Sequence, residues 1–167
     1  MTQPALWETI RDTLRRVAVA KGYTTLPHLG DAHSQTYEFR KAGKPKAIVA
    51  FRDVGKKATY ARPNRLWVEG LELVLDRYMN LNLSEPRLPP AFAVVSDNLR
   101  GHFVVAAIKD VLLRYHSRLQ KPHAEGSRVF TLTIEVRASS SFLVMPEDEP
   151  NRPLPDVDTF APILRVL

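Results

Sequence analysis

Residues 36–52 of this 167-residue chain read TYEFRKAGKPKAIVAFR, and the predicted fold is built around them. The first arm, Thr36–Lys41, places Tyr37 and Phe39 on one face, because alternate residues of a strand share a face. The second arm, Lys46–Arg52, follows an Ala-Gly-Lys-Pro turn, in which the proline lacks the amide hydrogen that strand pairing needs. The stretch therefore predicts a β-hairpin.

Hydrophobic periodicity predicts the remaining elements of the chain. Apolar residues that recur three and four positions apart are typical of amphipathic helices, whereas alternating or short continuous apolar runs are typical of strands. We expect helices at residues 4–21, 64–80 and 103–119, a loop at 23–34, a buried strand at 91–96, and a second hairpin made by 129–136 and 142–145.

These elements together predict an α+β fold. We expect one domain at residues 1–145, with a mainly antiparallel sheet of about five strands and three helices packed against one face of it. Residues 146–167 contain five prolines, and five acidic residues against two basic ones, so we expect an extended, Pro-rich acidic tail. Three interpretations of this tail stay open: a frayed terminus, a segment that folds over the basic hairpin, and a segment whose apolar end binds another protein.

Composition narrows the class of protein. The chain is 44% hydrophobic and 25% charged, values typical of a soluble globular domain. It has no cysteine, which excludes disulfides, thiolate metal sites and cysteine nucleophiles. No uncharged stretch approaches the roughly 20 apolar residues that a membrane helix needs, and the N-terminal region has no secretory signal pattern. We therefore expect a cytoplasmic protein without a membrane partner.

Positive charge is concentrated in one segment of the chain. Lys and Arg number 24 against 18 Asp and Glu, a formal net charge of +6. Residues 40–65 hold nine of these bases and one acid, so they supply essentially all of the excess. Basic side chains contact phosphates, a two-stranded ribbon fits a nucleic-acid groove, and an exposed aromatic ring can stack on a base. The predicted nucleic-acid-binding residues are Arg40, Lys41, Lys44, Lys46, Arg52, Lys56, Lys57, Tyr60, Arg62 and Arg65. The alternative is a solvated hairpin whose lysines block edge-to-edge strand pairing.

Strand carboxylates offer a second interpretation, a metal-dependent nuclease. Nucleases of the PD-(D/E)xK type place two acids and a lysine on neighbouring strands, where they hold Mg²⁺ and orient water. This chain has arginine at the position of that lysine, so its match to the pattern is partial. The candidate catalytic residues are Asp53, Asp97, Glu135 and Arg137, and candidate ligands for a separate metal site are His28, Asp31 and His33.

The glycine-rich loops of nucleotide-binding proteins and the serine-hydrolase elbow are both missing from the sequence. The leading expectation is a non-catalytic nucleic-acid-binding or accessory protein that needs no cofactor. The alternatives are a nuclease that uses Mg²⁺, and a protein-interaction subunit of a larger complex, which would use the apolar end of the tail and the helix expected at 103–119. The oligomeric state stays open.

Overall fold

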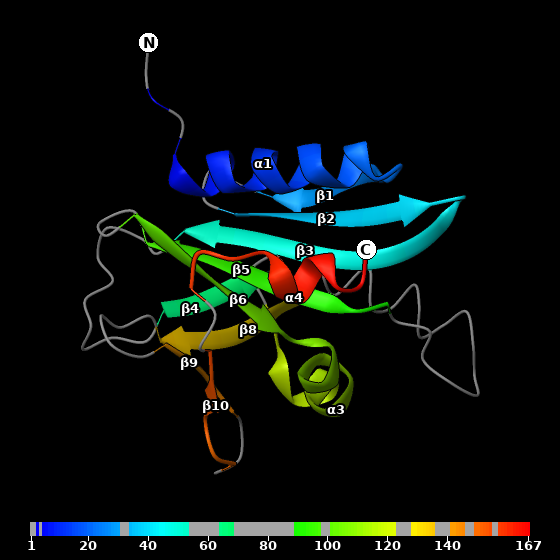
Figure 1. The fold of residues 1–167 in the computed structure, drawn as a ribbon. Coiled ribbons are helices and arrows are strands. Elements are labelled where there is room, and N and C mark those ends of the chain that lie inside the picture. The colour runs from blue at the N-terminus through cyan, green and yellow to red at the C-terminus, as the bar shows by residue number, and fades with distance from the viewer. Residues whose placement is uncertain are drawn as a thin grey trace.

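The structure is a computed structural model, and it describes residue 3 and residues 5–30, 34–53, 64–68, 89–97, 101–122, 128–135, 141–145, 149–154 and 157–167. In this part of the chain, two β-sheets lie between helices (Figure 1). The elements are α1 (Leu6–Ala20), β1 (Thr24–Gly30), β2 (Ser34–Lys41), β3 (Lys44–Asp53), β4 (Asn64–Val68), β5 (Ala91–Asp97), β6 (His102–Ala107), α3 (Lys109–Leu119), β7 (Gln120–Pro122), β8 (Arg128–Glu135), β9 (Phe142–Val144), β10 (Arg152–Pro153) and α4 (Ala161–Leu164).

The first sheet is mixed and has the strand order β1-β2-β3-β5-β6. Strand β2 pairs antiparallel with β1 and β3, and β6 pairs antiparallel with β5, whereas β3 and β5 run parallel. The second sheet has the order β10-β9-β8-β4, and β7 also pairs with β8.

The α+β class is thus confirmed. The expected single sheet is wrong, because the strands form two sheets, and the first of these is mixed through the parallel pair of β3 and β5. Local residue patterns identify strands without giving the direction in which distant strands pair. Between β3 and β5 the chain passes through β4 of the second sheet, and a parallel pair requires such a long connection.

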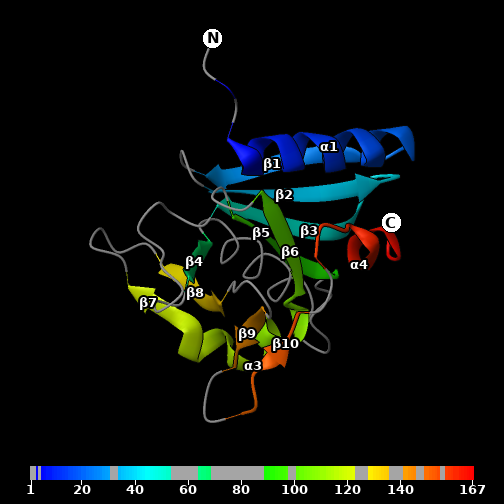
Figure 2. The same ribbon diagram turned by 60° about the vertical axis from the view of Figure 1, so that its left-hand side comes forward.

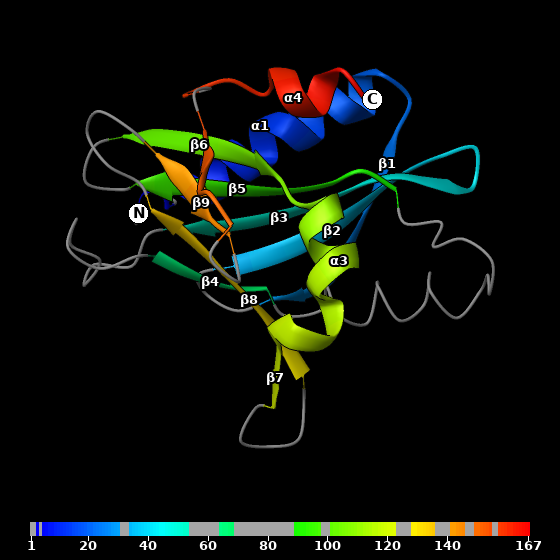
Figure 3. The ribbon, with the colours of Figure 1, turned by 90° about the horizontal axis from the view of Figure 1, so that it is seen from below.

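Helices cover both faces of the first sheet, so the expectation of three helices on one face is wrong. Helix α1 packs its apolar stripe on one face, together with Ile163 of α4. On the other face, Val111 and Leu112 of α3 pack with Ile134 and Leu143 of the second sheet. Figure 3 shows α3 and β8 in front of the first sheet, with α1 behind it. The sheet has apolar residues on both faces, and each face therefore needs its own cover.

Helix α1 confirms the prediction at residues 4–21, and local contacts fix both of its ends. The Glu8 carboxylate accepts a hydrogen bond of 3.0 Å from the backbone N–H of Ala5, which satisfies a free donor of the first turn. At the other end Gly22 has a φ of +87°, and the N–H of Tyr23 donates to the carbonyl oxygen of Ala18. This is the Schellman arrangement that ends many helices at a glycine.

Three further predictions are confirmed: the hairpin of β2 and β3, the buried strand β5, and the hairpin of β8 and β9. Three others are wrong in part, and α3 confirms residues 109–119 of the last expected helix. The expected loop at 23–34 contains β1, the expected helix at 64–80 begins as β4, and the expected helix at 103–119 begins as β6. Residues 69–80 lie outside the described part of the chain. In short runs the helical and strand periods are hard to tell apart, and pairing with β2, β8 and β5 decides these three cases.

The described part of residues 146–167 packs against the domain instead of extending away from it. Strand β10 pairs with β9, and Val157 forms a bridge with Val104 on β6. The Ile163 side chain is fully buried in the hydrophobic cluster that contains the apolar residues of α1, and Figure 2 shows α4 on the right, below α1. Apolar residues of the C-terminal segment therefore complete the core. A protein partner for this segment stays a prediction.

In the described residues, no helix has the length and apolar character to span a membrane.

Candidate functional site

The turn between β2 and β3 is a tight two-residue turn within the basic segment. Ala42 and Gly43 form it, with positive φ values of 52° and 74°. This backbone is characteristic of the type I′ turn, whose twist matches that of the two strands it joins. A glycine adopts it freely, whereas an alanine in a left-handed conformation is destabilised by about 1–2 kcal/mol. Lys41 and Lys44 flank the turn and lie directly opposite each other.

The hairpin extends beyond its neighbours in the first sheet. Pairing of β2 with β1 reaches no further than Arg40, and pairing of β3 with β5 begins at Ile48. Residues 41–47 therefore have no neighbour on the β5 side, and the turn with Lys41 and Lys44 extends beyond β1 as well; Figure 1 shows this turn at the right-hand side of the molecule. We call residues 41–47 the ribbon tip.

Four exposed lysines gather at this end of the molecule, and we call them the tip lysines. The Lys41 ammonium lies 5.0 Å from the centre of the Tyr23 ring. Its Cε is 3.7 Å from the position that a Cβ on Gly22 would take, so the side chain reaches the end of α1. Within the described part of the chain, no tip lysine forms an ion pair. The tip lysines are Lys21 at the end of α1, and Lys41, Lys44 and Lys46 of the hairpin.

Arg40 differs from these lysines because its guanidinium forms an ion pair and a hydrogen bond within the protein. Its Nη1 lies 2.6 Å from Oε1 of Glu38, a carboxylate with 0% exposure. Its Nη2 donates a hydrogen bond of 2.6 Å to the carbonyl oxygen of Gly43. The guanidinium therefore connects a buried acid to the turn. Residues two apart on a strand share a face, so the spacing of Glu38 and Arg40 in the sequence already indicated that the two side chains could pair.

The other predicted basic residues do not join the ribbon tip in the described part of the chain. Arg52 is at the opposite end of β3, eight positions from Lys44, and about 3.3 Å per residue separates the two by roughly 26 Å. The backbone of Arg65 belongs to β4 in the second sheet, and its side chain is not described. Lys56, Lys57, Tyr60 and Arg62 lie outside the described residues, as do Asp31, His33, Arg137 and the side chain of His28.

Two candidate catalytic residues lie at the far end of the first sheet, on adjacent strands. Asp53 ends β3 and Asp97 ends the parallel neighbour β5, and both are buried, with 7% and 5% exposure. The register pairs Asp53 with Ser96, so Asp53 and Asp97 project from opposite faces of the sheet. Glu135 ends β8 in the second sheet. In the part of the chain that is described, no three acidic or histidine side chains form a metal-binding group.

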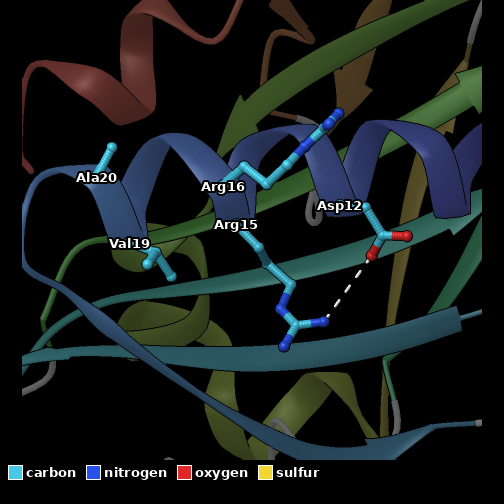
Figure 4. A pocket seen from close by; sticks show the side chains of 5 residues that line it. All are labelled: Asp12, Arg15, Arg16, Val19 and Ala20. Atoms are coloured by element: carbon cyan, nitrogen blue, oxygen red, sulfur yellow. Dashed lines mark ion pairs between the residues drawn. The ribbon is translucent and has the colours of Figure 1, made fainter.

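A shallow depression of about 480 Å³ lies on α1 and is lined by Asp12, Arg15, Arg16, Val19 and Ala20. Figure 4 shows Arg15 reaching toward the strands and Arg16 pointing to another side of the helix. Arg15 donates to the Thr25 hydroxyl at 3.0 Å, and its guanidinium lies 4.7 Å from the centre of the Tyr37 ring. These contacts attach α1 to the sheet.

Arg11, like Arg15, donates hydrogen bonds to other side chains of the protein. It donates hydrogen bonds to the Asp12 carboxylate at 2.9 Å and to the Gln35 side chain at 3.1 Å. The hydrogen bond from Arg11 lowers the pKa of Asp12 below its ordinary value. Two of the three arginines of α1 thus hold the helix in place, which leaves Arg16 as its exposed cation.

The two ends of the first sheet therefore differ in chemistry. The ribbon tip presents exposed ammonium groups, which are hydrated point charges suited to phosphate oxygens. The opposite end presents buried carboxylates, which are suited to cations. Sequence reasoning missed Lys21 at the tip, because only the folded chain brings the end of α1 beside β2.

Comparison of this chain with protein-family models, with curated proteins and with solved structures finds no match.

Proposed function

We propose that this protein binds nucleic acid without catalysing a reaction on it, and that the ribbon tip makes the contact. The observation that carries the proposal is the pairing of Lys41 with Lys44 directly across the turn. Like charges at directly opposite positions destabilise a hairpin. Neither lysine forms an ion pair within the described residues. Phosphate groups of a bound polyanion would remove the repulsion between the two ammonium groups.

The shape of the ribbon tip supports a duplex ligand. A two-stranded β-ribbon fits the major groove of B-DNA, which is about 12 Å wide. Lysines at the tip would contact phosphates on the groove edges, and such contacts hold a protein on the duplex without reading its sequence. We therefore expect similar affinity for duplexes of unrelated sequence.

Fluorescence anisotropy with labelled DNA tests the proposal. The ligands are a duplex of about 20 base pairs, roughly two helical turns, and its separated single strands. The test variant is Lys41→Gln with Lys44→Gln. The control variant is Lys109→Gln with Arg114→Gln, both on α3 and on the other side of the first sheet. Each variant loses two of the wild type's six net positive charges. A difference in affinity between the two variants therefore reports the position of the lost charges and not the net charge.

We expect the wild type to bind the duplex with a dissociation constant of about 10⁻⁶ to 10⁻⁴ M near physiological salt. The logarithm of the binding constant falls by about 0.9 per decade of salt for each phosphate contacted. The tip variant should therefore flatten the salt slope by about 1.8, whereas the control should leave the slope unchanged. Equal losses in the two variants would show that net charge alone drives binding, and would contradict a site at the ribbon tip.

A second candidate function, a nuclease dependent on Mg²⁺, is favoured by one observation. Asp53 and Asp97 are buried at the ends of adjacent parallel strands, a position where ligands often bind in sheets with parallel strands. Incubation with plasmid DNA and with RNA, in Mg²⁺, Mn²⁺ or chelator, distinguishes the two proposals. A binding protein retards the nucleic acid without cutting it. Metal-dependent cleavage that Asp53→Asn abolishes would favour the nuclease.

A further inference from the structure

We infer that Arg40 is a positioning residue of the ribbon tip: it orders the turn so that the tip lysines can contact phosphate, and it does not itself contact phosphate. The inference rests on the proposed function, because it assigns separate roles to neighbouring cations of the same site. The sequence alone places Arg40 among the phosphate-binding residues, since it is one of nine bases in residues 40–65.

The contacts of Arg40 form a continuous connection from the sheet to the turn. Glu38 is fully buried on β2, and its Oε1 lies 2.6 Å from Nη1 of Arg40. Nη2 of the same guanidinium lies 2.6 Å from the carbonyl oxygen of Gly43. A guanidinium is planar and holds its donors in a fixed fork. One rigid group therefore fixes the turn relative to a buried anchor.

The backbone of the ribbon tip needs this support because its own pairing is weak. A register shift between Phe39 and Arg40 pairs Phe39 with Ala47 and Arg40 with Pro45, so Lys46 has no partner residue on β2. Proline has no N–H to donate to the ladder. Beyond this irregularity only two pairs remain, Arg40 with Pro45 and Lys41 with Lys44, and the charges of the second pair repel. We therefore expect the ribbon tip to fray where the fork of Arg40 is lost.

The ion pair with Glu38 also affects how binding depends on salt. Each unpaired cation that contacts a phosphate releases counterions and steepens the salt slope. A cation already paired with a carboxylate brings little uncompensated charge to phosphate. The Glu38 anion offsets the Arg40 charge at 2.6 Å, whereas Lys41 and Lys44 form no ion pair with a described residue. The salt slope should therefore respond to the lysines and be insensitive to Arg40.

The test variant is Arg40→Lys, because lysine keeps the positive charge but replaces the planar fork with a single flexible ammonium group. We expect duplex affinity to fall about tenfold, since a disordered tip must be ordered on binding. The salt slope should stay at the wild-type value. In the free protein, the NMR order parameter of the Gly43 amide should fall from about 0.85 toward 0.6. Circular dichroism checks that the variant is folded.

A second substitution provides a rescue that adds no charge. Asparagine tolerates positive φ better than alanine, so Ala42→Asn stabilises the turn directly. We expect Arg40→Lys combined with Ala42→Asn to recover affinity and Gly43 order together. Recovery of both would separate a positioning role from a phosphate contact, because the rescue leaves the charge at residue 40 unchanged.

The inference is overturned if Arg40→Lys matches the wild type in affinity and in Gly43 order. It is also overturned if Arg40→Gln flattens the salt slope by about 0.9, the value for one phosphate contact. Absence of any binding by the wild type would refute the proposed function instead. The order parameter of Gly43 in free Arg40→Lys would then decide by itself whether Arg40 holds the turn: a fall supports that role, and no change contradicts it.

Discussion

Ile163→Ala tests whether the C-terminal segment is part of the core. The Ile163 side chain has 0% exposure and packs with apolar residues of α1 and the first sheet. The substitution removes three carbon atoms at about 0.8 kcal/mol each, and a cavity term adds to this loss. We therefore expect the free energy of unfolding to fall by about 3 kcal/mol, a large part of the roughly 5–15 kcal/mol available to a domain.

Urea denaturation followed by circular dichroism measures this change. The midpoint should shift with little change in slope, because the surface exposed on unfolding is nearly the same. Val166→Ala is the matched control, since Val166 lies three residues away with 39% exposure, and we expect it to change stability by no more than about 0.5 kcal/mol. An equally small effect of Ile163→Ala would refute the packing of α4 and support a frayed terminus.

Three further predictions concern the turn, the acid stability and the sheet edge. Ala42→Gly should raise the free energy of unfolding by about 1 kcal/mol, because glycine adopts the φ of 52° without strain; a denaturant titration that shows a loss of stability contradicts the turn. The hydrogen bond from Arg152 lowers the pKa of Asp110, so this pair stabilises the fold above about pH 4, and the stabilisation is lost as the pH falls through the folded pKa. Asp110→Asn should thus weaken the acid dependence of stability, by less than about 1 kcal/mol for an exposed pair; an identical acid titration contradicts this role. Removal of residues 157–167 uncovers the edge of β6 at Val104, so light scattering should detect self-association, and a variant that stays as dispersed as the full chain contradicts the covering role.

Local patterns were sufficient for the elements whose pairing is local. The turn residues and alternation in residues 36–52 predict β2 and β3, and the spacing of apolar residues predicts α1. Strand β6 could not be separated from α3 by periodicity, because its apolar run is short and continues directly into the helix. Pairing with β5 decides its conformation, and that contact depends on the whole fold.

The second sheet and the parallel pair β3–β5 depend on contacts between distant segments, which single-sequence patterns do not encode. The same limit applies to the candidate site. Charge density identified Lys41, Lys44 and Lys46, whereas the role of Arg40 depends on the buried Glu38 beside it. Lys21 was missed because its proximity to β2 arises only from the packing of α1 on the first sheet.

A titration of the isotopically labelled protein with duplex DNA, followed by amide chemical shifts, tests most directly where nucleic acid binds. We expect the largest changes at the ribbon tip, in the amides of Lys41, Ala42, Gly43, Lys44 and Lys46. We expect small changes at Asp53 and Asp97, at the opposite end of the first sheet. The largest changes at those two carboxylates, with an unperturbed ribbon tip, would contradict the proposed interface.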